Sequence, residues 1–256
     1  MTNVLVCIKR SADTTGEVVL NAEGTALDGR HSGYAISEHE LVALEVAATI
    51  AEADKGSVTV LTLGEKDALE QLREALSVGA NDAVHIVADA TQYGPADVAS
   101  AIADVVRARE ASGIAYDLIL LGNDAADTGN FQVGIRLAYA LDRPVVAGAQ
   151  QIEVEDGVAS IHVESAAGTE TYEVSLPAVA TVLTGGVSPR YPSLRGRMRG
   201  KKAPVESVTP VAEPRGTGAL GLRVPPATAS QVTVLGKGAD GARAIVEVLR
   251  KLGVVS

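Results

Sequence analysis

At 256 residues and 46% apolar, the chain can bury one sizeable core, and its formal net charge of −10 argues against general affinity for nucleic acid or anionic membranes. The single cysteine, Cys7, excludes an intrachain disulfide and a multi-cysteine metal cage. Because the start lacks a signal-peptide pattern and no apolar run approaches the roughly 20 residues of a membrane helix, we expect a cytoplasmic protein without direct membrane insertion.

The first 150 residues alternate apolar runs with helical patterns. Four short runs are continuously apolar, as strands buried on both faces of a parallel sheet are: residues 4–9, 58–64, 83–87 and 117–122. Between them Leu, Val and Ala recur at three-to-four spacing, which is typical of helices with one buried stripe. This alternation predicts an α/β fold with a doubly wound, mainly parallel sheet.

After Pro144 the pattern changes to strand-like segments separated by turns, which predicts an antiparallel or mixed extension of the sheet. Residues 185–226 hold seven prolines and seven glycines with almost no periodicity, which indicates a long extended arm. The chain is expected to close with a strand at 231–235 and a helix at about 241–252. These features predict three parts: an α/β domain (1–184), an arm (185–227) and a C-terminal strand and helix (228–256).

A polar, glycine-bearing loop follows the fourth predicted strand. A helix is predicted to begin at about Gly129, so its N–H groups and the positive end of its dipole would face this loop, which favours a phosphate. Gly122, Gly129 and Gly134 would permit close backbone approach. An ordinary strand-to-helix connection, with Asp127 or Thr128 as the helix N-cap, explains the same residues equally well.

Ser37 and Glu40 stand before the first helical pattern with the spacing of a capping box. In that motif the hydroxyl accepts a hydrogen bond from the amide three residues on, and the carboxylate reaches back to the cap. A capped helix end beside the first strand can also line a nucleotide site, because it lies where the strand order of such a sheet reverses. Both interpretations can hold together.

The residues that could support catalysis or metal binding form no convincing set. Asp124 and Asp127, three apart in the loop, could hold a hydrated metal or act as an acid/base pair, but such pairs more often cap or are solvated. Two G-x-G-x-x-G matches, Gly216–Gly221 and Gly236–Gly241, lack the full strand-helix-strand context of the dinucleotide fingerprint. The sequence therefore predicts no catalytic residue and no metal ligand.

A cationic segment, PRYPSLRGRMRGKK, stands out from the acidic chain. It carries six cations and no acidic residue: Arg190, Arg195, Arg197, Arg199, Lys201 and Lys202. A solvated loop is one interpretation. We favour docking of an acidic protein partner, because local charge steers encounter and an exposed apolar tip such as Leu194 can anchor it. Nucleic acid is a lesser alternative, since Tyr191 is the only aromatic residue in the segment.

Taken together, these stretches resemble the beta subunits of electron-transfer flavoproteins. The opening VLVCIKRSAD is similar to the start of that family, and SEHELVALEVA to its first helix. LLGNDAADTGNFQVG resembles the family's nucleotide loop. SLPAVATVLTGG and the cationic segment after it resemble the family's L-P-A-V-x-T stretch and partner-recognition loop. The resemblance covers nearly the whole chain.

This resemblance implies an adenine-nucleotide alpha-hydrolase-like fold, a larger alpha subunit as partner, an FAD held mainly by that subunit at the interface, and AMP in this chain. The implied nucleotide-binding residues are Cys7, Ser37, Glu40, Leu63, Gly122, Asn123, Asp124, Ala125, Ala126, Asp127, Thr128, Gly129, Asn130, Phe131, Gln132 and Val133. The implied partner-recognition residues are Arg190, Tyr191, Leu194, Arg195, Arg197, Lys201 and Lys202. Glu164 corresponds to an acidic position that helps hold the mobile FAD domain.

The leading hypothesis is an electron carrier, not itself an enzyme, which takes electrons from flavin dehydrogenases of the acyl-CoA type and passes them through a quinone oxidoreductase to the quinone pool. Gln132 to Gly134 resemble bifurcating members, in which a second FAD replaces AMP. At two positions this chain differs from typical members of the family: Ser37 and Glu38 stand where those members have Asn and Pro. Thr14 stands where some members have a Tyr. A stand-alone adenine-nucleotide-binding module is the third hypothesis.

Overall fold

The computed structural model describes residues 1–13, 18–25, 27–28, 33–218, 221–226 and 232–255. Contacts divide the chain into two units, Met1–Leu222 and Arg223–Ser256. Thr14 and residues 219–220 of the first glycine motif lie outside the described residues. The three-part division expected from the sequence stays a prediction.

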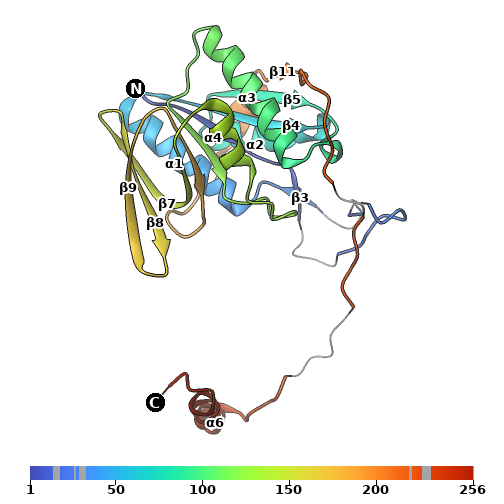
Figure 1. Ribbon diagram of the computed structural model, residues 1–256, viewed down its shortest axis with the longest axis vertical. Coiled ribbons are helices and arrows are strands. Elements are labelled where there is room, and N and C mark those ends of the chain that lie inside the picture. Colours follow the sequence, from blue (N-terminus) through green and yellow to red (C-terminus); the bar gives the residue numbers. More distant parts are fainter. Residues whose placement is uncertain (14–17, 26, 29–32, 219–220, 227–231, 256) are drawn as a thin grey trace. The chain divides into compact units, whose positions relative to one another are not determined.

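The first unit is built around a nine-stranded sheet (Figure 1). Its parallel strands are β1 (Asn3–Cys7), β4 (Ser57–Gly64), β5 (Asp82–Val87), β6 (Leu118–Gly122), β7 (Val145–Glu155), β10 (Ala178–Val182) and β11 (Glu206–Val208). Two antiparallel strands, β8 (Val158–Ser165) and β9 (Gly168–Ser175), extend it from β7. The order is β11-β5-β4-β1-β6-β10-β7-β8-β9, which confirms the predicted mainly parallel sheet with an antiparallel extension.

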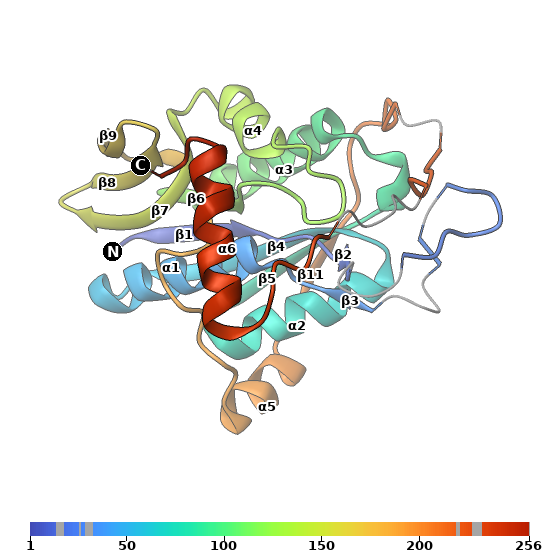
Figure 2. The same cartoon turned by 90° about the horizontal axis from the view of Figure 1, so that it is seen from below.

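Helices cover both faces of this sheet (Figure 2). The helices on one face are α1 (Glu38–Asp54) and α2 (Leu69–Val78), and those on the other are α3 (Pro95–Ala111) and α4 (Val133–Leu141). Short 3-10 turns at Lys66–Ala68 and Ala90–Gln92 precede α2 and α3. Alternate residues of β1 serve the two cores: Val4 and Val6 pack with α1, whereas Leu5 and Cys7 pack with α3. Burial on both faces explains why the strands are continuously apolar.

The strand order reverses at β1, which lies between β4 and β6. The chain runs from β1 to β4 and β5 on one side and then returns to β6 on the other side. In open α/β sheets, ligands bind beyond the carboxyl ends of the strands at such a reversal. The segments that follow β1 and β6 are therefore the first place to look for a binding site.

Residues 185–226, predicted to be an extended arm, contain two ordered elements. α5 (Leu194–Lys202) packs against α2, and β11 pairs with β5 at the edge of the sheet. The prediction of an arm without packed elements was therefore wrong. Two glycines and five cations make α5 a poor helix former on its own, so tertiary contacts and not local propensity form it.

Three other details differ from the sequence-based expectation. α4 begins at Val133, later than the predicted start at Gly129. Residues 232–235 form no strand, so the strand predicted there from β-propensity is wrong for these four residues; Gln231, its first residue, lies outside the described residues. The helix that follows is present as α6 (Gly238–Lys251). A small antiparallel pair, β2 (Ser11–Ala12) and β3 (Tyr34–Ala35), was not predicted.

Candidate functional site

The start of α1 is tied directly to the end of β1. The Ser37 hydroxyl accepts a hydrogen bond from the Glu40 amide at 3.4 Å, and Glu40 Oε2 accepts one from the Ser37 amide at 3.0 Å, which confirms the predicted capping box. Glu40 Oε1 accepts a further hydrogen bond from the Lys9 amide at 2.9 Å. One buried carboxylate thus joins the helix to the segment that follows the strand.

The loop from Asn123 to Gln132 lies against the same two elements. Lys9 Nζ forms an ion pair with Asp127 at 2.6 Å, and His39 Nε2 contacts Asp124 at 3.0 Å. His39 Nδ1 accepts a hydrogen bond from the Thr184 amide, so its Nε2 carries the hydrogen that faces Asp124. The structure therefore brings together the predicted residues Ser37, Glu40, Asp124 and Asp127.

His39 and Lys9 were missed by sequence reasoning. Nothing in the spacing of the histidines indicates a site, because this imidazole acts through a backbone amide and a carboxylate that are distant in sequence. Lys9 was visible only as the charge that ends the first apolar run. Its position at the strand-order reversal is the signal that could have identified it.

Two glycines permit the close packing of this region. A Cβ at Gly122 would lie 2.9 Å from Glu40 Cγ, and one at Gly134 would lie 2.3 Å from Thr181 Cγ2. Gly129 has a positive φ of 55°, which a side chain rarely adopts. The three predicted glycines are thus required by the backbone path of the loop and by its approach to α1 and β10.

The N-terminus of α4 has no side-chain cap. Its N-cap is Gln132, whose side chain makes no capping hydrogen bond, and its first turn contains no acidic residue. The prediction of Asp127 or Thr128 as the cap was therefore wrong. Unpaired first-turn N–H groups favour an anion at this end of a helix. Of the two explanations that the sequence left open, this observation favours the phosphate.

The carboxylates around the loop are largely compensated. Lys9 neutralises Asp127, and burial raises the pKa of Glu40 from 4.5 to about 7, although hydrogen bonds from Ser37 and Lys9 favour its charged form. The buried Ser11 hydroxyl, just after β1, has no hydrogen-bond partner in the described part of the chain. Compensated acids, an unpaired hydroxyl and an uncapped helix fit a phosphorylated ligand such as a nucleotide.

Other predicted nucleotide-binding residues differ in their surroundings. The side chains of Cys7 and Leu63 are buried in the apolar core that packs against α3, and burial raises the pKa of the Cys7 thiol. Asn123 accepts a hydrogen bond from the Thr181 hydroxyl at 2.6 Å and so holds the start of the loop to β10. Phe131 is 55% exposed. Glu164 is exposed on β8, in the antiparallel extension.

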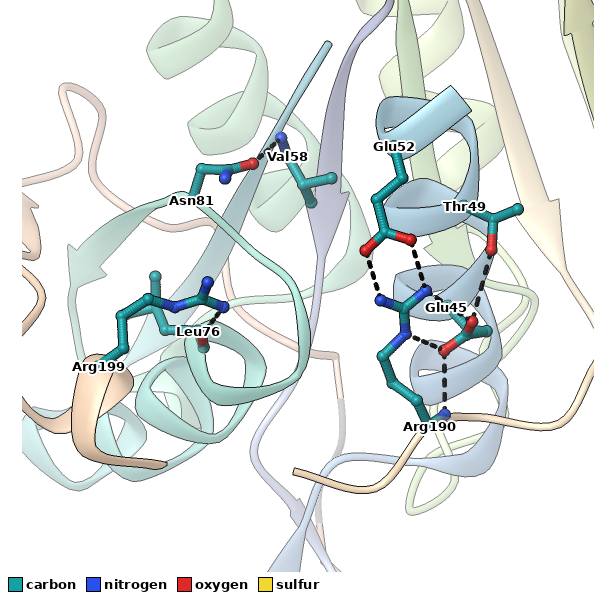
Figure 3. A network of polar contacts seen from close by, with 8 residues as sticks. All are labelled: Glu45, Thr49, Glu52, Val58, Leu76, Asn81, Arg190 and Arg199. Atoms are coloured by element: carbon teal, nitrogen blue, oxygen red, sulfur yellow. Dashed lines mark hydrogen bonds and ion pairs between the residues drawn. The ribbon is translucent and has the colours of Figure 1, made fainter. Parts of the chain in front are cut away.

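A second candidate site is the cationic helix α5, which is seated on α2 by its glycine face. A Cβ at Gly196 would lie 2.2 Å from the Ser77 carbonyl oxygen, and one at Gly200 would lie 2.6 Å from the Arg73 carbonyl oxygen. Arg73 donates to the carbonyls of Gly200 and Ala203. Arg199 donates to the Leu76 carbonyl at 3.1 Å (Figure 3). Glycine thus allows backbone contact between the two helices.

Opposite this glycine face, α5 and the residues before it expose apolar side chains among cations. Tyr191 is 95%, Leu194 79% and Met198 59% exposed. Five cations of α5 are exposed, and Arg199 among them donates to the Leu76 carbonyl; the other four are Arg195, Arg197, Lys201 and Lys202. These four are grouped with the apolar side chains. Sequence reasoning missed Met198, which lies one helical turn after Leu194 and would have been found had the helix been predicted. We call these seven residues the docking surface.

Arg190, one of the expected partner-recognition residues, makes ion pairs within the chain. Its guanidinium is paired within the chain with Glu45 and Glu52 of α1 (Figure 3). The cations of the segment therefore fall into two groups: Arg190 and Arg199 are bonded to α1 and α2, and the remaining four belong to the docking surface.

Comparison with known proteins identifies the family. Residues 28–213 match the model of the electron transfer flavoprotein domain. The chain is 32% identical to the electron transfer flavoprotein subunit beta of Syntrophomonas wolfei over 234 residues, which cover 90% of this chain and 89% of the relative. The chain belongs to the electron-transfer flavoprotein beta-subunit family. This confirms the family expected from the sequence.

Two further relatives support this assignment. The electron transfer flavoprotein subunit beta of Bacillus subtilis is 30% identical over 206 residues, which cover 80% of this chain and 78% of the relative. Subunit CarD of the caffeyl-CoA reductase-Etf complex of Acetobacterium woodii is 34% identical over 207 residues, which cover 79% of this chain and 76% of the relative. Among the described residues of this electron-transfer flavoprotein subunit, no helix is long and apolar enough to cross a membrane, and no cluster of three or more His, Cys, Asp or Glu side chains could hold a metal ion.

The first testable prediction concerns Glu40. Because its pKa is raised from 4.5 to about 7 on folding, its contribution to the free energy of unfolding is complete below pH 4.5 and is lost as pH rises through about 7. We expect Glu40→Gln to remove this part of the pH dependence, as measured by chemical denaturation between pH 4 and 8. Glu38→Gln, an exposed change in the same turn, should leave the dependence as in the wild type. Parallel curves for the wild type and Glu40→Gln would contradict the assignment.

The second prediction concerns the glycine face of α5. In a solvated helix, Gly→Ala stabilises by about 1 kcal/mol. Here the added methyl meets backbone, so we expect Gly196→Ala to lower the free energy of unfolding by about 1–3 kcal/mol and to speed tryptic cleavage within α5. Gly33→Ala is the control, because no atom of the described residues other than its chain neighbours lies within 4 Å of its added Cβ. Stabilisation by Gly196→Ala would show that α5 is not seated as described.

Proposed function

We propose that this chain is the small subunit of a heterodimeric electron-transfer flavoprotein. It pairs with a larger alpha subunit that holds the electron-carrying FAD near the interface. The complex accepts electrons from flavin dehydrogenases of the acyl-CoA dehydrogenase type. It passes them through a quinone oxidoreductase to the quinone pool. Family membership supports the electron-transfer role. In this proposal the complex is cytoplasmic, and the chain positions a cofactor and a partner but performs no acid/base catalysis.

AMP is the nucleotide proposed for the loop at residues 123–132. The observation that carries this step is the N-terminus of α4 at the strand-order reversal, which has no side-chain cap, because the N–H groups of such a helix end favour a phosphate. Ser37, Gly122 and the loop from Asn123 to Val133 would surround the nucleotide. Lys9 and His39 would hold the acidic residues of the loop in place. AMP in this site would be structural, because it joins the loop to α1 and α4.

The docking surface is proposed to receive the redox partner. Leu194 and Met198 would enter an apolar recess on the dehydrogenase, while Arg195, Arg197, Lys201 and Lys202 would face acidic residues around it. The exposed carboxylate of Glu164 on β8 would help to hold the mobile FAD domain of the alpha subunit.

A second candidate function is electron bifurcation, with FAD in place of AMP in this chain. The residues that favour it are Gln132 to Gly134, which begin α4 and resemble those of bifurcating members. The similarity to a subunit of the caffeyl-CoA reductase-Etf complex also favours it. A stand-alone nucleotide-binding module is less consistent with the structure, because it would need neither α5 nor the exposed docking surface.

The third prediction tests the cofactors. Co-expression with the alpha subunit should give a heterodimer that contains one FAD and one AMP, quantified by chromatography after denaturation. Gly122→Ala should lower the AMP content while FAD is retained, because its methyl would displace Glu40; Gly33→Ala should not. Two FAD per heterodimer would replace the carrier with the bifurcating alternative. Absence of a complex or of flavin would overturn the proposed function.

The fourth prediction tests the charge of the docking surface. Charge reversal by Arg195→Glu or Arg197→Glu should slow reduction of the heterodimer by an acyl-CoA dehydrogenase, most of all at low ionic strength, because salt already screens the wild-type attraction. Lys66→Glu makes the same charge change at an exposed position outside α5 and should have a much smaller effect. Equal slowing by all three substitutions would show that net charge, and not this surface, governs encounter.

A further inference from the structure

Arg190 makes an unusually complete set of contacts for a residue at the surface. Its Nε and Nη2 donate to the two oxygens of Glu45 at 2.8 and 2.9 Å. Its Nη1 and Nη2 donate to the two oxygens of Glu52 at 2.6 and 3.2 Å. The Arg190 backbone amide also donates to Glu45 at 3.0 Å. Figure 3 shows the guanidinium between the two carboxylates, and we call this arrangement the double fork.

The acceptors of the double fork lie along one side of α1. Glu45 and Glu52 are seven residues apart, two helical turns, and Thr49 between them donates to Glu45. Without Arg190 the two carboxylates would repel each other. Burial of Glu45 opposes its ionisation, but the hydrogen bonds that Arg190 donates to it lower the pKa of Glu45. The hydrogen bonds that Arg190 donates to Glu45 and Glu52 also raise the pKa of Arg190. The planar guanidinium is suited to this geometry because it can pair with two carboxylates at once.

Arg190 lies four residues before the start of α5, in the segment that connects β10 to that helix. A nine-residue helix with two glycines, five cations and no acid is not stable alone, since isolated helices below about 12–15 residues are marginal in water. Contacts with α2 through Gly196, Gly200 and Arg199 hold the body of α5. The double fork holds the chain just before the helix to α1. The exposed residues Leu194 and Met198 come soon after this anchored segment in the chain.

We propose that Arg190 is a positioning residue for partner docking. Its double fork fixes the segment that enters α5, and so fixes where Leu194 and Met198 stand relative to the body of the subunit; Arg190 itself does not contact the redox partner. This inference rests on the proposed function of the docking surface. It separates the cations by role, because loss of Arg190 would change the geometry of the surface while loss of an exposed cation would change its charge.

The test uses Arg190→Lys, which keeps the charge but cannot form the double fork, and Glu45→Gln, which weakens the fork from α1. Arg107→Lys, at an exposed position on α3 outside the docking surface, is the matched control. In the heterodimer, we expect both Arg190→Lys and Glu45→Gln to slow reduction by an acyl-CoA dehydrogenase about tenfold, because the docked geometry is lost. Arg190→Lys should leave the salt dependence of the rate unchanged, because it keeps the charge and the long-range attraction. Arg107→Lys should react as the wild type does.

A second readout needs no redox partner. Met198→Cys carries a nitroxide spin label on α5, and Cys7 stays unlabelled because it is buried. We expect Arg190→Lys and Glu45→Gln to increase the mobility of this label in the otherwise folded subunit, with Arg107→Lys as the control. Wild-type label mobility in Arg190→Lys would overturn the proposal. Slowed reduction in Arg190→Lys but not in Glu45→Gln would also overturn it, because it would indicate direct contact with the partner. If the dehydrogenase fails to reduce the wild type, the proposed function fails, and label mobility alone decides the role of Arg190.

Discussion

The buried carboxylate of Glu40 is the contact on which the candidate nucleotide site depends. It accepts hydrogen bonds from Ser37 and Lys9, so it closes the start of α1 and fixes the first residues after β1. Its side chain also fills the space beside Gly122 that any larger residue would need. Burial of this group costs free energy, as its raised pKa shows. This cost is offset by the contacts of the side chain, which joins the residues after β1 to the start of α1 and lies beside Gly122 at the end of β6.

α1 links the two candidate sites. Its first turn holds Glu40 against the nucleotide loop, and its later turns present Glu45 and Glu52 to the segment before α5. The loop and the docking surface are therefore positioned by one rigid helix whose opposite side is buried in the sheet. A change in how α1 lies on the sheet would move both, so a structural nucleotide at one end of α1 would also help to keep the docking surface in place.

The sequence predicted most of the fold because buried parallel strands and amphipathic helices leave patterns that depend on local composition. The capping box of Ser37 and Glu40 was found for the same reason: its partners are three residues apart. α5 was missed because its helix depends on contact with α2, which brings Gly196 close to Ser77. The closing strand was predicted from β-propensity alone, and its described residues, 232–235, show that propensity does not by itself make a strand.

Composition alone does not show which cations of the cationic segment bond to α1 or α2 and which belong to the docking surface. Six cations without an acid are visible in the sequence, but their roles depend on partners more than 100 residues away in the chain: Arg190 is 145 residues from Glu45, and Arg199 is 123 from Leu76. Those two side chains bond to α1 and α2, and the other four are the cations of the docking surface. On a subunit with a net charge of −10, a local patch of four cations steers only over about a Debye length. The effect of the patch therefore depends on its being held in one position. Arg190 and Arg199 hold it there through their bonds to α1 and α2.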